Sequence, residues 1–306
     1  MNNHHQRPTD IPRREFLTTV AAGAVVGAAA PSILAPLIAS GEEPKPWTLR
    51  LSASSINFQQ LPVERACQRI AELGFEGIDI WSAHEGCPHL DDVLTRLGSE
   101  GLKNALAEHE LKLFSFSVYR GGYPRYAELL GQVGGGVAVR GSTGPCEPKD
   151  LIPRMRDFLK SLQTEVELAE KHDSYVAIEN HGNALLDSLD SLKAFVDMNR
   201  SPRLGIALAP YHLQALNVSV EKAIEICGRQ LLFFYAWQRA DGTKQLPGHG
   251  PTDFAPWITA LAKARYGGYV NPFMHGELKP DAMSQALTKS RDYLIRCDKE
   301  RKVKRP

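Results

Sequence analysis

Short apolar segments alternate with longer segments of helical periodicity from residue 47 onward. Apolar residues recur at helical spacing in the longer segments, most clearly as Met155, Phe158, Leu162 and Val166. This alternation predicts a parallel sheet with crossover helices. Eight such units over about 250 residues predict a (β/α)8 TIM barrel, whereas a doubly wound open sheet is expected to show a GxGxxG turn after its first strand and none is present. The predicted strands are 48–53, 77–81, 112–118, 137–140, 175–179, 204–208, 231–237 and 269–274.

The chain before the first strand has the pattern of an export signal. Arg13 and Arg14 stand just ahead of an Ala- and Gly-rich apolar stretch, which resembles a twin-arginine signal peptide over residues 1–39. Cleavage after Ala30 or Ala39 fits this pattern, and the mature protein is then periplasmic or extracellular with no stable membrane span. The alternative is an amphipathic helix or an uncleaved anchor, although the stretch is short for a spanning helix.

The predicted organisation continues with a linker at 40–46, the barrel at 47–298 and a basic C-terminal tail at 299–306. Lys and Arg total 36 against 35 Asp and Glu, and removal of residues 1–39 leaves 33 of each. A neutral chain has no electrostatic footprint for nucleic acid or for anionic membranes. The partner expected from this balance is a small neutral or weakly anionic molecule. The five cysteines form no CxxC pair and are expected to be small buried residues.

Polar and aromatic residues gather where the predicted strands end. The carboxyl ends of barrel strands carry the chemistry in this fold, so these residues are candidate site residues. Alternation along a strand places Glu179 on the barrel interior, and it places Tyr235 with Trp237 on one face of another strand. The candidates are Trp81, Arg140, Glu179, Asn180, His181, His212, Tyr235, Trp237, Gln238, His249 and His275.

Several of these segments, taken in order, resemble one enzyme family. They are 72–80 (ELGFEGIDI), 177–181 (AIENH), 205–212, 248–254 (GHGPTDF) and 266–270 (YGGYV). In these segments the sequence resembles the sugar phosphate isomerase/epimerase family, also described as xylose isomerase-like TIM barrels. The resemblance implies a barrel that acts on a carbohydrate or polyol. Apurinic DNA endonuclease activity, also found in the superfamily, is disfavoured by the neutral charge.

The resemblance also implies one divalent cation, held by Glu, Asp, His and Glu from strands five to eight. Only the first ligand is retained, as Glu179, because the other three positions fall on Ala209, on Tyr235 (or Ala236 if the alignment shifts by one residue) and on Phe273. The cofactor is therefore either one cation (Mn, Mg, Zn or Co) at a non-standard site that includes Glu179, or none. His275 lies two residues beyond the lost Glu position and on the same strand face.

Three interpretations follow, and the sequence leaves them open. The first is a metal-free isomerase or epimerase that transfers a proton next to a carbonyl, with Glu179 as base and His212 and His275 as acid or carbonyl polariser. The second is a sugar lyase or dehydratase with a relocated metal site. The third is a non-catalytic, exported carbohydrate-binding protein. The substrate-binding residues expected in each case are Asn180, His181, Tyr235, Trp237, Gln238, His249, Arg140 and Trp81.

Overall fold

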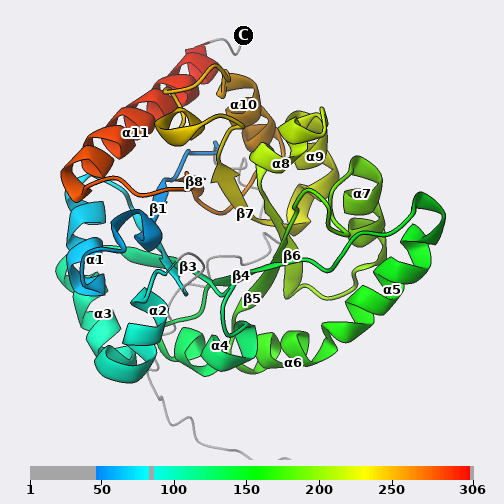
Figure 1. Cartoon of the computed structure of the whole chain (residues 1–306), viewed down its shortest axis with the longest axis horizontal. Coiled ribbons are helices and arrows are strands. Elements are labelled where there is room, and N and C mark those ends of the chain that lie inside the picture. The colour runs from blue at the N-terminus through cyan, green and yellow to red at the C-terminus, as the bar shows by residue number, and fades with distance from the viewer. Residues whose placement is uncertain (1–45, 83–85, 304–306) are drawn as a thin grey trace, which may run out of the picture. The chain divides into compact units, whose positions relative to one another are not determined.

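Eight parallel strands form one sheet in sequence order, and helices surround it (Figure 1). The structure, a computed structural model, describes residues 46–82 and 86–303. The sheet confirms the predicted (β/α)8 TIM barrel. Its strands are β1 Ser52–Ser54, β2 Gly77–Trp81, β3 Lys112–Ser117, β4 Val137–Gly141, β5 Tyr175–Glu179, β6 Leu204–Leu208, β7 Leu231–Ala236 and β8 Val270–Pro272.

The first and last strands close the barrel along one seam. Leu51 forms a parallel bridge with Val270, whose amide donates to the carbonyl of Arg50 at 2.9 Å. The Ser52 hydroxyl donates to the Asn271 side chain at 3.1 Å. These bonds join residues more than 200 positions apart, so the sheet closes into a nearly complete ring.

A second set of contacts holds the two ends of the barrel together next to this seam. The indole nitrogen of Trp47 donates to the carbonyl of Tyr266 at 2.6 Å. The guanidinium of Arg301 lies 5.2 Å from the Trp47 ring and pairs with Asp298 at 2.6 Å. Arg301 and Asp298 are both buried, so the last helix is fixed on the first residues of the barrel.

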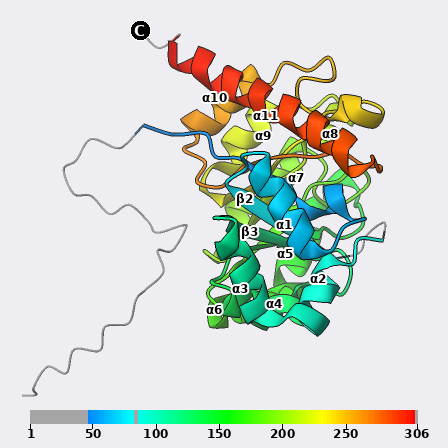
Figure 2. The same cartoon turned by 90° about the vertical axis from the view of Figure 1, so that its left-hand side faces the viewer.

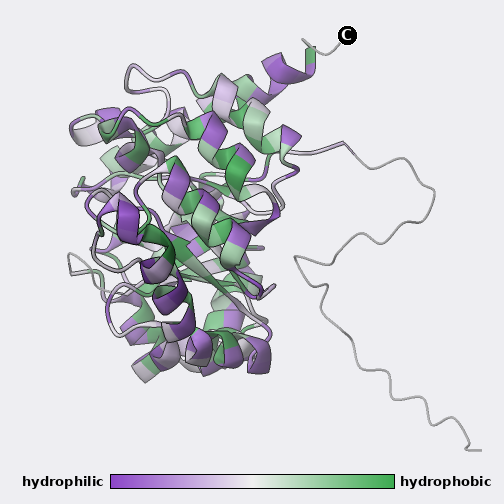
Figure 3. Ribbon diagram, turned by 90° about the vertical axis from the view of Figure 1, so that its right-hand side faces the viewer, coloured by the Kyte–Doolittle hydropathy of each residue, from purple (hydrophilic) through white to green (hydrophobic). Residues whose placement is uncertain are grey.

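Helices cover the outside of the sheet (Figure 2). Hydrophilic and hydrophobic residues alternate along these helices (Figure 3). Among the described residues no helix is long and apolar enough to cross a membrane. The helices are α1 Val63–Glu72, α2 His89–Asp92, α3 Gly98–Glu108, α4 Tyr123–Gln132, α5 Leu151–Ser161, α6 Gln163–Lys171, α7 Leu189–Met198, α8 Pro210–Ala215, α9 Val220–Cys227, α10 Ala255–Lys263 and α11 Pro280–Val303.

Two segments differ from the sequence prediction. The segment 119–133, which the pattern does not place, contains α4. The predicted basic tail begins inside α11, because that helix continues to Val303 and buries Arg301. The predicted signal peptide and most of the linker lie outside the described residues.

The hydrophobic core has two layers that follow the alternation of the strands. One layer lies between the sheet and the helices and includes Val176 and Ile178 of β5. The other fills the barrel interior and includes Ala177 together with Phe233 and Tyr235 of β7. Interior aromatic side chains pack closely; for example, Phe114 stacks on Phe233 with ring centroids 4.9 Å apart. The interior is therefore a packed core, and the site must lie at its carboxyl-terminal mouth.

Candidate active site

Glu179 ends β5 and lies at the mouth of the barrel. Strand alternation places it on the same face as Ala177, which belongs to the interior layer. Its side chain is 8% exposed, and the Tyr119 hydroxyl donates to its Oε2 at 2.7 Å. Burial raises the pKa of Glu179 to about 7, and the Tyr119 hydrogen bond opposes that rise. A carboxyl group that titrates near neutral pH can accept a proton or donate one.

Two tyrosines form a hydroxyl pair beside Glu179. The Tyr119 and Tyr235 oxygens are 3.1 Å apart, and Tyr119 directs its hydrogen bond to Glu179. Burial raises the pKa of both phenols well above the usual value, so both remain neutral hydroxyls. The direct hydrogen-bond partner of Glu179 is therefore polar but uncharged.

Aromatic rings form the wall of the mouth. Trp81 stacks on Phe273 with ring centroids 5.3 Å apart, and the Tyr119 ring lies tilted against Trp81 with its centroid 5.0 Å away. Tyr211 stacks on Trp237 at 4.3 Å, with an angle of 14° between the two rings. Carbohydrate rings present apolar C–H faces, and flat aromatic walls with polar tips suit such ligands.

Two histidines lie beside Trp237, and a third lies against one of them. His181 and His212 have ring centroids 3.9 Å apart, and His212 and His275 lie 5.2 Å and 4.8 Å from the Trp237 ring. Burial lowers the pKa of His212 to about 3, with further lowering by His181 and His275. His212 is therefore neutral at physiological pH and can offer one N–H donor. His181 and His275 are exposed at the mouth.

Two of the predicted binding amides bond to the backbone instead. Asn180 clamps the ends of β5 and β6, because its Nδ2 donates to the Ala209 carbonyl at 3.2 Å and its Oδ1 accepts from the Ala209 amide at 2.6 Å. Gln238 anchors the loop after β7: its Nε2 donates to the Leu246 carbonyl at 2.9 Å, and its Oε1 accepts from the Thr252 amide at 2.8 Å. Both side chains hold backbone segments around the mouth in place and do not point into the mouth.

The structure places two other predicted residues away from Glu179. The ring of His249 bonds to the carbonyl of Ala286 on α11 at 3.0 Å, so it fixes its loop to that helix. Arg140 pairs with Glu165 of α6 on the outside of the barrel. Its neighbour Val139 belongs to the interior layer, and strand alternation therefore turns Arg140 outward.

We expect Asn180→Ala to lower the free energy of unfolding by about 1–3 kcal/mol. The substitution leaves the buried amide of Ala209 without a partner, whereas the Ala209 carbonyl still accepts a hydrogen bond from the His212 amide at 3.2 Å. Urea denaturation followed by circular dichroism measures the loss. Asn180→Asp keeps the acceptor but buries a carboxyl group against the Ala209 carbonyl, so its loss should be at least as large and should grow as the pH rises. Equal stability of the alanine variant and the wild type would contradict the clamp.

A family model described as "Xylose isomerase-like TIM barrel" matches residues 67–293, well over half of the chain. The chain belongs to this family. No curated protein sequence matches it significantly.

Solved structures similar to this xylose isomerase-like barrel share its fold at low identity. The 3-keto-D-glucoside 4-epimerase from E. coli is 18% identical, with a TM-score of 0.62, and covers 80% of this chain and 100% of its own. D-Psicose 3-epimerase from Clostridium cellulolyticum H10 is 15% identical, with a TM-score of 0.62 and coverage of 80% and 99%. A probable 3-DHS dehydratase from Bacillus anthracis is 16% identical, with a TM-score of 0.63 and coverage of 78% and 97%.

The family's divalent cation does not fit the residues of this xylose isomerase-like barrel. Ala209 carries no ligand atom in its side chain, and Phe273 stacks on Trp81 where a carboxylate would be needed. Tyr235 is neutral and bonds to Tyr119. Within residues 46–82 and 86–303, no group of three His, Cys, Asp or Glu side chains is close enough to hold a metal ion. We therefore derive no chemical step through a metal.

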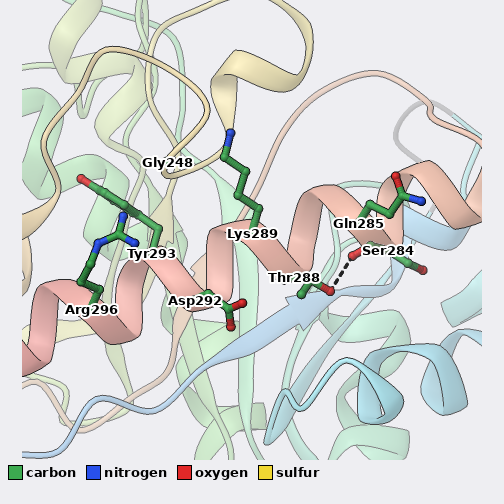
Figure 4. A pocket seen from close by; sticks show the side chains of 8 residues that line it. All are labelled: Gly248, Ser284, Gln285, Thr288, Lys289, Asp292, Tyr293 and Arg296. Atoms are coloured by element: carbon green, nitrogen blue, oxygen red, sulfur yellow. Dashed lines mark hydrogen bonds between the residues drawn. The ribbon is translucent and has the colours of Figure 1, made fainter.

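Two pockets of this barrel lie on its outer helices, and neither is lined by Glu179. One, of about 540 Å³, is formed by α11 and the loop at Gly248, and its lining includes Lys289, Tyr293 and Arg296 (Figure 4). The other, of about 760 Å³, is lined by residues of α9, α10 and α11. No residue of the described strands lines either pocket, whereas this fold places its chemistry at the strand ends, so we assign the site to the mouth.

Sequence reasoning did not select three residues of the mouth and interior. Tyr119 follows β3 and bonds to Glu179, but it stands in the segment that the pattern left unplaced. Asn57, just after β1, has a buried Nδ2 with no hydrogen-bond partner in the described structure. Asp79 is buried without any exposed surface and accepts hydrogen bonds from several serines. A polar residue at an interior position of a strand is the signal that marks Asp79 in the sequence.

Proposed function

We propose that the protein is an isomerase or epimerase that transfers a proton next to a carbonyl group of a carbohydrate or polyol, without a resident metal ion. The observation that carries this proposal is Glu179, whose carboxyl lies at the barrel mouth with a pKa of about 7. A base works best when its pKa is near the operating pH, because it is then ionised in a large fraction of molecules and still binds the proton well.

The surrounding residues supply the other parts of the reaction. His212 is neutral and offers an N–H donor that polarises the substrate carbonyl, while the exposed His275 exchanges protons with solvent. Tyr211, which is half-buried and stacks on the buried Trp237, provides the aromatic surface for the sugar ring. Activities named for the structural neighbours, keto-sugar and ketose epimerisation, support the same reaction class.

Incorporation of solvent deuterium tests the proposal directly. D-Fructose, D-tagatose and a 3-keto-D-glucoside are incubated with the protein in D2O, and the sugars are analysed by mass spectrometry and NMR. We expect deuterium on the carbon next to the carbonyl, at equal rates after chelator treatment and after addition of Mn²⁺. A rate that depends on Mn²⁺ would refute the metal-free mechanism. If no sugar exchanges deuterium but sugar binding is measurable, the protein is a carbohydrate-binding protein and not an enzyme of this class.

The second candidate is a non-catalytic carbohydrate-binding protein. Loss of three of the four family ligand positions to Ala209, Tyr235 and Phe273 favours it, because the aromatic wall remains when the metal chemistry is lost. A lyase or dehydratase with a relocated metal needs a ligand group that the described residues do not assemble.

Tyr119→Phe is expected to shift the pH dependence of the reaction upward. The hydrogen bond from Tyr119 stabilises the ionised form of Glu179, so its removal raises the pKa of Glu179 above about 7. A base must be ionised, and the rising limb of the kcat/KM profile therefore moves to higher pH. Profiles of deuterium exchange between pH 5 and pH 9 measure the shift. Tyr211→Phe also removes a mouth hydroxyl but leaves Glu179 untouched, so its profile should match the wild type; an unshifted Tyr119→Phe profile would oppose Glu179 as the base.

We further propose that the protein is exported by the twin-arginine route, on the strength of Arg13 and Arg14 ahead of the apolar stretch. Export favours free or oxidised sugars over phosphorylated metabolites as substrates. Fractionation of cells that produce the full chain tests this, since protein confined to the cytoplasm would contradict it.

A further inference from the structure

Asp79 is a second buried carboxyl group, and the proposed reaction does not use it. It lies within β2 and has no exposed surface. Ser54 donates to its Oδ2 at 2.8 Å, and Ser115 and Ser117 donate to its Oδ1 at 2.9 Å each. The Trp81 indole nitrogen also donates to Oδ2. These donors come from β1, β2 and β3 and are all neutral.

Three hydroxyl groups connect Asp79 with Glu179 at the mouth. The Ser117 oxygen, which touches Asp79, lies 3.5 Å from the Tyr235 oxygen. The Tyr235 oxygen lies 3.1 Å from the Tyr119 oxygen, which lies 2.7 Å from Glu179 Oε2. We name Ser117, Tyr235 and Tyr119 the hydroxyl relay. Each of its members can accept one hydrogen bond while it donates another, and the Ser117 to Tyr235 contact is the longest.

We propose that Asp79 exchanges a proton with Glu179 through the hydroxyl relay. When a proton leaves Glu179, its O–H bond breaks, each relay hydroxyl receives one proton and passes one on, and an O–H bond forms on Asp79. The relay is neutral before and after, and one proton has moved between two carboxyl groups. The transfer restores the ionised base while a substrate still covers the mouth, so this inference rests on the proposed function for its purpose.

The two ends of the relay have similar surroundings. Burial is the main cause that raises the pKa of both Asp79 and Glu179 above the usual carboxyl range, so each group favours the protonated form more than an exposed carboxyl does. Other titratable groups that feel Asp79 are Cys87 and Tyr235; burial raises the thiol pKa to about 12 and raises the phenol pKa as well, so both stay neutral. The amide of Asn271 reaches Asp79 only through Ser54, to which its Nδ2 donates at 2.7 Å.

Infrared spectroscopy of the full chain tests the relay without any substrate. Near pH 5 both carboxyl groups are largely protonated, and the C=O bands that disappear in Asp79→Asn and in Glu179→Gln assign the two signals. Rapid transfer into D2O then gives the rate at which deuterium replaces the proton on Asp79. Because the measurement does not use turnover, its failure is distinct from failure of the proposed function, which the sugar assay detects.

Ser117→Ala and Ser115→Ala form a matched pair. Both remove a hydroxyl that bonds to Asp79 Oδ1 at 2.9 Å; Ser117 also bonds to Oδ2 at 3.0 Å, and it is the serine that contacts Tyr235. We expect Ser117→Ala and Tyr235→Phe to slow exchange at Asp79 by about tenfold or more, equivalent to about 1.4 kcal/mol in the barrier, and Ser115→Ala to stay within about twofold. Equal exchange rates in both serine variants would overturn the relay. Circular dichroism checks that each variant folds. If Ser117→Ala does not fold, the comparison of Tyr235→Phe with Ser115→Ala tests the relay in its place.

Discussion

Glu179→Gln is expected to lower the rate of proton transfer by about 10²–10⁴-fold, the usual contribution of a general base, while sugar affinity changes only a few-fold. Glutamine has nearly the same shape and keeps an oxygen that accepts the Tyr119 hydrogen bond, so the mouth is preserved. The amide cannot take a proton at any pH of interest. Deuterium-exchange assays quenched at set times give the rate of proton transfer, and isothermal titration calorimetry gives the sugar affinity.

Glu165→Gln is the control for this substitution. Glu165 is also partly buried, but it pairs with Arg140 outside the barrel, so its replacement should leave the rate within about twofold of the wild type. If Glu179→Gln retained the wild-type rate, Glu179 would not be the base. If wild type and variant both bound sugar with no exchange in either, the protein would be the carbohydrate-binding protein of the second candidate.

Trp237→Ala is expected to lower the free energy of unfolding by about 3–5 kcal/mol, as for other large aromatic residues in a packed interior, and to weaken sugar binding at least tenfold. Trp237 is buried, stacks on Tyr211 at 4.3 Å and meets His212 and Phe273 edge to face. Its indole also donates to Gln245 at 2.8 Å. Urea denaturation and calorimetry measure the two effects.

Trp257→Ala separates stability from binding. Trp257 lies in α10, is also buried and packs on Phe254 at 4.4 Å, but it belongs to the outer layer. Its replacement should cost a similar free energy of unfolding and leave sugar affinity unchanged at a temperature where both variants are folded. Equal affinity of Trp237→Ala and Trp257→Ala for the sugar would show that the aromatic wall is not the binding surface.

Strand position and direction could be predicted from the sequence because a barrel strand is a short apolar run whose alternate residues face opposite layers. Six of the predicted starts coincide with observed ones, as in β2 at Gly77 and β5 at Tyr175, while β1 and β8 begin later, at Ser52 and Val270. Helix α4 escaped prediction because Gly121, Gly122 and Pro124 break the apolar periodicity at its start.

The residues that face inward at the mouth could also be predicted from the sequence, because alternation along β5 and β7 gives the orientation of Glu179 and Tyr235. The same rule turns Arg140 away from the interior, because Val139 faces inward, yet a strand-end position alone made Arg140 a candidate. Residues that bond to distant backbone could not be assigned. Asn180 and Gln238 meet partners that the three-dimensional fold alone brings to them.

The seam between β1 and β8 has a consequence for the timing of folding. Arg50 at the start of the barrel bonds to Val270 of β8, and Trp47 packs against Arg301 of α11, so β8 is needed before the ring can close. Contacts of such sequence separation form slowly. While the chain is still on the ribosome, β1 has only β2 as a neighbour and its other edge is open. The barrel can therefore close only after β8 has been synthesised, and any transport that requires a folded passenger has to wait for that event.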